Sequence, residues 1–213
     1  RKKIAYTVFE DVGAIGGVDA LVILGGDGTV LKAAIAAGRK GIRVLGINAG
    51  NLGFLTEFEG EQVAEAVALL TGRAEVERRS VLEVRAGGQT FYALNDAVFQ
   101  RGAGGAADDN VVAVTAFIDG KKVDEFVGDG VIVSTPTGST AYSLSAGGSI
   151  LTPDIEAFIL TPICAHSLHN RPIVFADSSE LRVRLADSAV ALDLFCDGRS
   201  ALTMAGGEEA VLR

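Results

Sequence analysis

Residues 20–29 read Ala-Leu-Val-Ile-Leu-Gly-Gly-Asp-Gly-Thr, and this stretch is the clearest indicator of the fold. A short, continuously apolar run is typical of a buried strand in a parallel sheet. The glycine-rich turn that follows opens into the apolar segment Thr29 to Ala37, which has the length and composition of a helix. Strand, turn and helix in this order predict the first βα unit of an α/β domain.

The same alternation continues as far as residue 73. Val44 to Ile47 repeats the strand pattern, and Glu61 to Leu70 repeats the helical one. Beyond Arg73 the helical periodicity gives way to short β-branched or alternating runs separated by Gly and Asp turns, which predicts an all-β region. The strands expected there include residues 81–84, 111–118, 131–133, 173–175 and 181–185.

These patterns predict two domains. The fold class is an α/β N-terminal nucleotide domain over residues 1–74 and an all-β C-terminal domain over residues 75–213, with a return of the C-terminal end to the first domain left open. No Pro/Ser-rich linker marks the boundary near Glu75, so we expect a packed interface that holds the ligand. The loosely composed segment Gly102 to Asn110 is predicted to be a mobile hairpin loop.

The glycine turn has the features of a phosphate site. After a parallel strand, its backbone N–H groups point outward and the following helix N-terminus carries partial positive charge, which favours phosphate. The residues predicted to bind phosphate are Gly25, Gly26, Gly28 and Thr29. The turn is neither a Walker A loop, since no Gly-Lys-Ser/Thr follows, nor the GxGxxG fingerprint of dinucleotide-binding domains.

Asp27 is the distinctive residue of this turn. Bound phosphates repel a carboxylate unless it meets a metal ion or takes a proton, so Asp27 indicates Mg²⁺ binding or base catalysis on an attacking hydroxyl. In an isolated Gly-Gly-Asp-Gly it would more often be an ordinary helix cap or turn residue. Because lipid kinases of the diacylglycerol type and phosphofructokinases carry similar turns, the motif predicts phosphoryl transfer without naming the substrate.

Residues 129–150 form a second polar segment, rich in small and hydroxyl-bearing residues. Asp129 precedes an expected strand, and the segment Thr135 to Gly138 turns into a short helix. A spacing of three residues places Tyr142 and Ser145 on one helical face, where the ring can stack on a base or ribose. A lone tyrosine would more often be a core or interface residue, but the run Thr135 to Tyr142 is far more specific.

Asn95 and Asp96 are two adjacent polar residues in an otherwise apolar predicted strand. Their neighbours include Leu94, Val98 and Phe99. Buried polar side chains require partners or a ligand, although a turn or an edge strand would also account for the pair.

Taken together, the Gly25–Thr29 turn and the 129–150 segment resemble the ATP-NAD kinase family. Three further blocks match in the family's order, namely Asn48 to Leu55, Ala93 to Asp96 and Pro162 to Leu168, so the resemblance covers nearly the whole chain. Family members normally begin with an extra strand and helix and continue beyond Leu212, whereas this chain starts at Arg1 without Met, so we expect trimmed termini.

The resemblance implies transfer of the γ-phosphoryl group of ATP to the 2′-hydroxyl of the adenosine ribose of NAD, with Mg²⁺ or another divalent metal. Asp27 would orient and deprotonate that hydroxyl, Asn95 and Asp96 would reach ribose hydroxyls, and Phe54 would pack against adenine. The NAD-binding residues so implied are Asp27, Gly28, Phe54, Asn95, Asp96, Asp129, Thr140, Ala141, Tyr142 and Ser145.

Three residues depart from the family's pattern. The family usually has Asn-Glu where this chain has the shorter Asp96, a basic residue is common at Val127, and a Gln that contacts the dinucleotide is common at Arg199. The resemblance therefore does not imply that the Asp96 carboxylate reaches the ribose hydroxyls, nor that Val127 or Arg199 contacts the dinucleotide.

Composition limits the partners. With 27 acidic and 19 basic residues the net charge is −8, which disfavours nucleic-acid binding. Cys164 and Cys196 lie far apart without CxxC spacing, and no cluster completes a metal site with His166 and His169, so we assign no metal to them. The absence of a long apolar run predicts a soluble, cytoplasmic protein without membrane contact, and the resemblance alone implies a homo-oligomer, a dimer or tetramer.

Two other functions stay open at this stage. One is a lipid kinase of the diacylglycerol or sphingosine type, which would need a deep apolar channel, whereas residues 134–145 are mostly small, hydroxylic or aromatic. The other is a non-catalytic NAD(P)-binding sensor, which the intact Asp27 disfavours.

Overall fold

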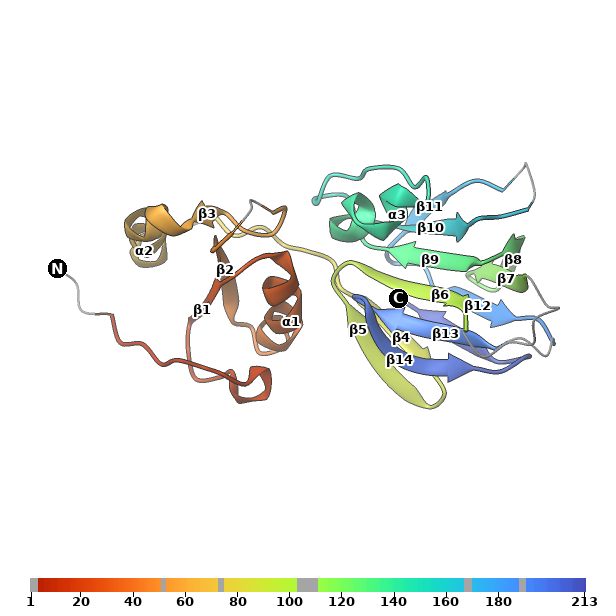
Figure 1. Ribbon diagram of the computed structural model, residues 1–213, viewed down its shortest axis with the longest axis horizontal. Helices are drawn as coiled ribbons and strands as arrows, with labels where there is room; N and C mark the ends of the chain where they lie inside the picture. Colours follow the sequence, from red (N-terminus) through yellow and green to blue (C-terminus); the bar gives the residue numbers. More distant parts are fainter. Residues whose placement is uncertain (1–3, 51–52, 73–74, 103–110, 167–169, 188–190) are drawn as a thin grey trace. The chain divides into compact units, whose positions relative to one another are not determined.

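The structure is a computed structural model, and it describes the following residues: 4–50, 53–72, 75–102, 111–166, 170–187 and 191–213. The chain divides into two compact units, residues 1–76 and 77–213 (Figure 1). Residues 103–110 of the expected hairpin loop, together with His169, lie outside the described residues.

The first unit is an α/β domain built on a three-stranded parallel sheet with the strand order β1-β2-β3. Its elements in chain order are η1 (Val12–Ala14), β1 (Ala20–Leu24), α1 (Asp27–Gly38), β2 (Arg43–Asn48), β3 (Phe58–Glu59), η2 (Gly60–Gln62) and α2 (Val63–Thr71). The two strands and two helices expected from the sequence are present, and the second helix begins with the 3₁₀ turn η2.

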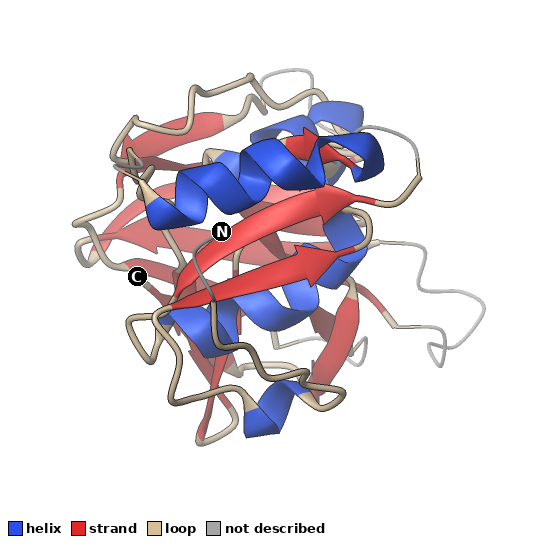
Figure 2. Cartoon of the chain, turned by 90° about the vertical axis from the view of Figure 1, so that its left-hand side faces the viewer, coloured by secondary structure: helices blue, strands red, loops and turns tan. Residues whose placement is uncertain are grey.

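The two helices cover opposite faces of this sheet (Figure 2). Helix α1 packs its Val30 and Ala33 against Ile23 of β1, while Ala66 of α2 packs against Leu45 and Ile47 of β2. Successive residues of a strand point to opposite faces, so the even-numbered residues of β2 face α1. Because β1 and β2 are parallel, their carboxyl ends lie at the same edge, where α1 begins.

The second unit contains two six-stranded sheets, and every strand pairing within them is antiparallel. One sheet has the order β11-β10-β9-β6-β13-β14 and the other has β5-β4-β15-β12-β7-β8. The elements are β4 (Leu82–Ala86), β5 (Gln89–Ala93), β6 (Asp96–Arg101), β7 (Val112–Ile118), β8 (Lys121–Gly128), β9 (Gly130–Ser134), η3 (Thr137–Thr140), α3 (Tyr142–Ser145), β10 (Ala157–Ile163), β11 (Ile173–Ala176), β12 (Leu181–Leu185), β13 (Leu192–Cys196), β14 (Arg199–Met204) and β15 (Glu209–Leu212).

The two sheets enclose one large hydrophobic core, to which Phe99 and Leu160 contribute from one sheet and Val183 and Leu212 from the other. The central strands β6, β9 and β10 are also covered on their second face, where Ile132 packs with Ala146 just beyond α3. Burial on both faces explains why these strands read as continuous apolar runs instead of alternating ones. The all-β prediction for this region is confirmed.

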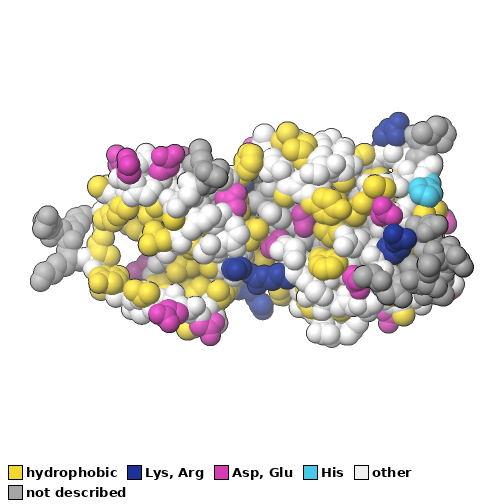
Figure 3. All heavy atoms as spheres, viewed as in Figure 1, with side chains coloured by type: hydrophobic (Ala, Val, Ile, Leu, Met, Phe, Trp, Pro, Cys, Tyr) yellow, Lys and Arg dark blue, Asp and Glu magenta, His cyan; other side chains and the backbone are white. Residues whose placement is uncertain are grey.

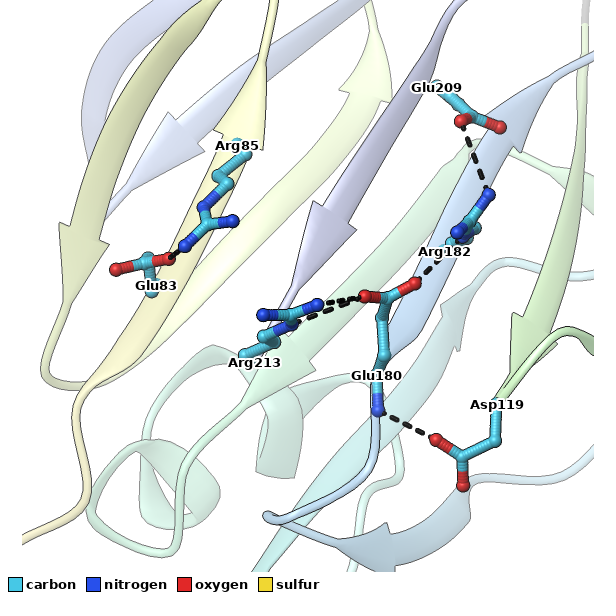
Figure 4. Close-up of polar contacts among 7 residues, drawn as sticks. All are labelled: Glu83, Arg85, Asp119, Glu180, Arg182, Glu209 and Arg213. Atoms are coloured by element: carbon cyan, nitrogen blue, oxygen red, sulfur yellow. Dashed lines mark hydrogen bonds and ion pairs between the residues drawn. The ribbon is translucent and has the colours of Figure 1, made fainter.

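Both units carry large apolar side chains at the surface, including Ile150 (63%) in the second unit. In the first unit several large apolar side chains are exposed, among them Tyr6 (86%), Val8 (75%) and Leu24 (69%), and Figure 3 shows apolar side chains on one of its faces. In the second unit, ion pairs join Glu180 to Arg182 and Arg213 across β12 and β15 (Figure 4). None of the helices in the described residues is long and apolar enough to span a membrane.

Candidate active site

The glycine turn after β1 has a backbone that only glycine adopts easily. Gly25 has a φ of 156°, and its amide donates to the carbonyl of Ile47 at 2.9 Å, which ties the turn to β2. A Cβ on Gly25 would lie 2.6 Å from Oγ1 of Thr29. Any side chain at this position would therefore push the turn away from the helix that follows.

Helix α1 begins directly after this turn, with Gly26 as its N-cap. The amides of Thr29 and Val30 donate to the carbonyl of Gly26 at 2.9 and 3.3 Å. Gly26 has no side chain to cap the helix. The start of a 12-residue helix without such a cap offers its N–H groups and its partial positive charge to an anion.

Asp27, the first residue of α1, points its carboxylate at the loop after β2. Oδ2 accepts the amide of Phe54 at 2.9 Å, and Oδ1 accepts that of Leu55 at 3.0 Å. Gly53 permits this approach, since a Cβ there would lie 2.1 Å from Oδ1 of Asp27. The structure thus fixes the orientation of Asp27 and leaves it partly exposed.

Phe54 is brought to the same place by this loop. Its backbone bonds to Asp27, while its side chain is 76% exposed. An exposed aromatic ring beside the polar turn offers a flat surface on which a base can stack.

Two buried polar atoms of the first unit have no hydrogen-bond partner among the described residues: Nδ2 of Asn48 and Oγ1 of Thr56. Asn48 is 2% exposed and ends β2 on the face that α1 covers, and its Oδ1 accepts the amide of Gly50 at 2.9 Å. The sequence reasoning did not single out either side chain. The signal for Asn48 was its position at the carboxyl end of a buried strand beside the glycine turn.

In the second unit, Asn95 lies just before β6, and Asp96 is its first residue. Both are held by Asp197, which the sequence reasoning did not propose as a site residue. Its Oδ1 accepts the amides of Asn95 at 2.7 Å and Asp96 at 3.3 Å, and its Oδ2 accepts that of Leu94 at 2.9 Å. The available signal was the Asp-Gly pair between two apolar runs, which predicts a hairpin turn.

The segment after β9 packs directly on Asn95. The amide of Thr135 donates to the carbonyl of Asn95 at 2.9 Å, and its hydroxyl donates to that of Leu94 at 2.6 Å. Gly138 lies so close that an added Cβ would be 2.0 Å from the Asn95 carbonyl oxygen. The two polar segments predicted from distant parts of the sequence therefore pack directly against each other.

Asp96 is the titratable group that this environment perturbs. Burial, and secondly the negative charge of Asp197, raises its pKa from 3.8 to about 6. The carboxyl is 5% exposed and shares the α3 side of the sheet with Val98 and Ile132. A buried carboxylate beside a second carboxylate is costly without a partner, and a ligand hydroxyl that donates to it would be such a partner.

Helix α3 presents the remaining predicted residues. Tyr142 is 42% exposed and Ser145 is exposed, whereas Ser143 is buried and bonds to the hydroxyl of Thr161 on β10 at 2.9 Å. This anchor turns the other face of the short helix outward. Thr140, the last residue of η3, and Ala141, between η3 and α3, are partly exposed.

Asp129 lies at the other end of β9. In the β6–β9 pairing, Ser134 is opposite Asp96 and Gly130 is opposite Gln100, so β9 separates Asp129 from the Asn95 region. Its carboxylate instead bonds to Cys164 and raises the pKa of that thiol. Within this one chain, Asp129 is not brought together with the other predicted residues of the second unit.

The structure also places Val127 and Arg199, which depart from the family's pattern, and His166, which was considered as a metal ligand. Val127 is in β8, where its carbonyl accepts the amide of His166 at 2.9 Å, and Arg199 begins β14 and is exposed. The described residues contain no group of three or more His, Cys, Asp or Glu side chains suited to hold a metal ion.

The chain matches two domains of a known family. Residues 6–74 match the ATP-NAD kinase N-terminal domain, and residues 94–213, more than half of the chain, match the ATP-NAD kinase C-terminal domain. Among relatives, the NAD kinase of Carboxydothermus hydrogenoformans is 41% identical in a match of 202 positions that covers 92% of this chain and 71% of that protein. The NAD kinase of Aquifex aeolicus is 38% identical over 90% of this chain and 71% of its own length.

Solved structures agree with this relationship. Yeast NADH kinase in complex with NADH has a TM-score of 0.81 and 35% identity over 92% of this chain and 58% of that chain. An NAD kinase from Archaeoglobus fulgidus in complex with ATP has a TM-score of 0.75 and 30% identity over 92% of this chain and 74% of its own. These relatives support an NAD kinase activity over a lipid kinase or a non-catalytic sensor. The chain belongs to the ATP-NAD kinase family of phosphotransferases.

Proposed function

We propose that this chain phosphorylates NAD at the 2′-hydroxyl of the adenosine ribose, with Asp27 as the group that orients and deprotonates that hydroxyl. The single observation that carries this assignment is the position of Asp27. It is the first residue of α1, directly after the glycine turn, and two backbone amides fix its carboxylate. A base must be held within hydrogen-bond reach of the proton that it abstracts, and a preset orientation serves that purpose.

In this proposal the phosphates of ATP lie at the start of α1. The residues that would contact them are Gly25, Gly26, Gly28 and Thr29, and the helix dipole would add to the attraction. The amides of Gly25 and Thr29 already donate to the carbonyls of Ile47 and Gly26, so Thr29 would act through its hydroxyl. The acceptor oxygen forms a new bond to the γ-phosphorus, the bond between that phosphorus and the β,γ-bridging oxygen breaks, and ADP leaves. The proton of the 2′-hydroxyl passes to the Asp27 carboxylate.

Asp27 fits a divalent metal as a single protein ligand, since the part of the chain that the structure describes holds no group of three or more His, Cys, Asp or Glu side chains suited to a metal. Mg²⁺ usually takes one or two carboxylates together with substrate phosphates and water. Each Asp27 oxygen accepts one amide and so keeps a free acceptor position. When bound there, Mg²⁺ or another divalent ion would neutralise charge on the phosphates.

The second unit would supply most of the NAD contacts. Asn95 and the buried Asp96 would form hydrogen bonds with ribose hydroxyls. Tyr142, on the outward face of α3, would stack on the ligand. Thr140, Ala141 and Ser145 would line the same surface, and Gly28 and Phe54 would contact the adenosine end from the first unit.

Asp129 requires a separate explanation, because β9 lies between it and the Asn95 region. We propose that it meets NAD either at the far end of the dinucleotide or in a homo-oligomer, where a second copy would bring it to the site. The dimer or tetramer expected from the sequence would allow the latter. A cytoplasmic location likewise stays a prediction.

An assay of ADP release from ATP, with the phosphorylated product identified, tests the proposed activity. The purified chain is given Mg²⁺-ATP with NAD, NADH, or mixed micelles of diacylglycerol or sphingosine as acceptor. We expect phosphorylation of the dinucleotide and none of the lipids, because the hydroxyls around Thr135 to Ser145 would be left unpaired against a lipid tail. Lipid phosphorylation without NADP formation, or NAD binding without phosphoryl transfer, would contradict the proposal.

A further inference from the structure

We propose that Asp197 is a positioning residue for NAD: its carboxylate fixes the backbone on which Asn95 and Asp96 stand, and thereby the direction in which both side chains meet the ligand. The inference rests on the proposed function of Asn95 and Asp96 as the groups that bind ribose hydroxyls. Asp197 itself need not touch the substrate.

The first argument is the number of bonds that converge on one side chain. Three consecutive amides, from Leu94 to Asp96, donate to the two oxygens of Asp197 at 2.7 to 3.3 Å. Hydrogen bonds to an ionised acceptor are stronger than neutral ones, and three of them leave the loop little freedom to rotate. The contact is reciprocal, since the amide of Asp197 donates to the carbonyl of Asp96 at 3.0 Å.

The second argument is where Asp197 stands in the fold. It follows Cys196, which pairs with Ala97 across β13 and β6, so its side chain reaches the start of β6 at the end of the ladder. With Gly198 it forms the turn between β13 and β14, and both residues have positive φ, 48° and 71°. Two-residue turns of this kind prefer Asn, Asp or Gly at the first position. Turn geometry therefore permits three residue types, and only Asp has two oxygens that can accept all three amides.

The third argument is electrostatic. Asp197 places a negative charge beside Asp96, a carboxyl that is already buried, and this unfavourable proximity weakens the fold. An Asn in the turn would avoid that repulsion at no cost in backbone strain. A carboxylate in this place is understandable if it holds the loop in the one arrangement that the ligand requires.

The chain contains a matched comparison residue. Asp119 and Gly120 form the turn between β7 and β8 with φ values of 49° and 76°. The Asp119 carboxylate accepts the amide of Glu180 and the hydroxyl of Ser179, each at 3.0 Å, as Figure 4 shows for Glu180. Its partners are not among the residues assigned to NAD or ATP, so Asp119 has the local chemistry of Asp197 without the proposed function.

The test compares Asp197→Gly, Asp197→Asn and Asp119→Gly in the purified full chain. Gly keeps both turns and removes the carboxylate, so we expect Asp197→Gly to raise the KM for NAD by about 10- to 100-fold while the KM for ATP changes less than about twofold. Asp197→Asn should lie between wild type and Asp197→Gly, because its one oxygen can still accept the Asn95 and Asp96 amides that share Oδ1. Asp119→Gly should leave both KM values unchanged.

A double-mutant cycle with Asn95→Ala separates positioning from general destabilisation. If Asp197 acts through Asn95 and Asp96, adding Asp197→Gly to Asn95→Ala should raise the KM for NAD much less than it does in the wild type. If the effects of the two substitutions on the KM for NAD are fully additive, the inference is overturned. It is also overturned if Asp197→Gly raises the KM for NAD and the KM for ATP in parallel. If Asp197→Gly fails to melt cooperatively, Asp197→Asn decides instead: a wild-type KM for NAD in that folded variant overturns the inference.

The outcomes also separate this inference from the function on which it rests. A wild-type chain that makes no NADP contradicts the proposed function. A wild-type chain that phosphorylates NAD, with a selective loss of NAD affinity in Asn95→Ala but none in Asp197→Gly, refutes only the role of Asp197.

Discussion

Asp27 in the first unit and Asp197 in the second make the same kind of contact. Asp27 accepts the amides of Phe54 and Leu55, and Asp197 accepts those of three consecutive residues that begin at Leu94. Each carboxylate thus holds a loop that is distant in sequence and carries a predicted NAD residue.

The surroundings of the two carboxylates differ. Asp27 stands at the start of a helix, beside a glycine turn suited to phosphate, so its carboxylate can meet the reacting groups. Asp197 stands in a hairpin turn, behind the residues that we assign to NAD. The comparison shows that the hydrogen-bond pattern of an aspartate does not by itself reveal its role, whereas the groups beside it do.

The largest effect is expected for Asp27→Asn. The amide keeps the shape of the side chain but cannot take the proton of the acceptor hydroxyl, so kcat should fall by about 10²- to 10⁴-fold. Its one oxygen can hold only one of the Phe54 and Leu55 amides, so NAD binding, measured by calorimetry, should weaken only a few-fold. Asp197→Asn makes the same chemical change and should instead act on the KM for NAD. If Asp27→Asn kept more than about a tenth of the wild-type kcat, a barrier change below ~1.4 kcal/mol, its role as base would be lost.

A smaller loss of kcat is expected for Gly53→Ala, which tests whether catalysis depends on the orientation of the Asp27 carboxylate. The added Cβ would lie 2.1 Å from Oδ1, so the carboxylate or the loop must move. A misplacement of about 1 Å near the reacting groups can cost about 10²-fold in rate. We therefore expect a drop in kcat of about 10- to 100-fold.

Gly38→Ala is the matched control for that change, because a Cβ on Gly38 meets nothing within 4 Å and Gly38, the last residue of α1, is not among the residues assigned to ATP or NAD. Its kcat should exceed that of Gly53→Ala clearly. Equal losses in the two variants would show that the orientation of Asp27 is not what Gly53 protects.

Asn95→Ala extends the comparison to the second unit. Loss of a directed hydrogen bond in a polar site costs roughly 1 to 3 kcal/mol, so the Kd for NAD should rise by about 5- to 150-fold, with little change for ATP. Calorimetry with each ligand separately gives the two numbers. Equal weakening of NAD and ATP would remove Asn95 from the NAD site.

Much of the fold was predictable because its signals are local. The run Leu21 to Leu24, the glycine turn and the segment Thr29 to Ala37 each indicate their structure without any distant contact, and all three are confirmed. The strand expected to contain Asn95 in fact begins at Asp96, because the Asp197 carboxylate and the Thr135 amide take the backbone groups before it.

The site was less predictable, because its supporting contacts join residues that are far apart in sequence. Asp27 and Asn95 stand in motifs, so the sequence pointed to them. Asp197 lies 101 to 103 residues from its three partners, and the need for a glycine at position 138 arises from the Asn95 carbonyl. Such contacts are set by sheet pairing and turn geometry, which no single stretch of sequence reveals.

The smallest effect concerns Asp96, whose pKa of about 6 follows from burial and from the charge of Asp197. The folded pKa lies above the unfolded value of 3.8, so the folded state binds more protons between these values, and wild-type stability should fall as the pH rises from about 4 to about 6. Asp96→Asn should abolish that fall and be the more stable protein at pH 7, as urea unfolding at several pH values can measure.

If ribose hydroxyls donate to ionised Asp96, the wild-type KM for NAD should also decrease as the pH rises through 6. Asp96→Asn should instead show a KM that does not change with pH and is several-fold higher than the wild-type value at pH 7. If Asp96→Asn kept the wild-type dependence of the KM on pH, another group would be the one that titrates. Asp197→Asn should move the midpoint of the KM profile to lower pH, because it removes the neighbouring charge that helps to raise the pKa of Asp96.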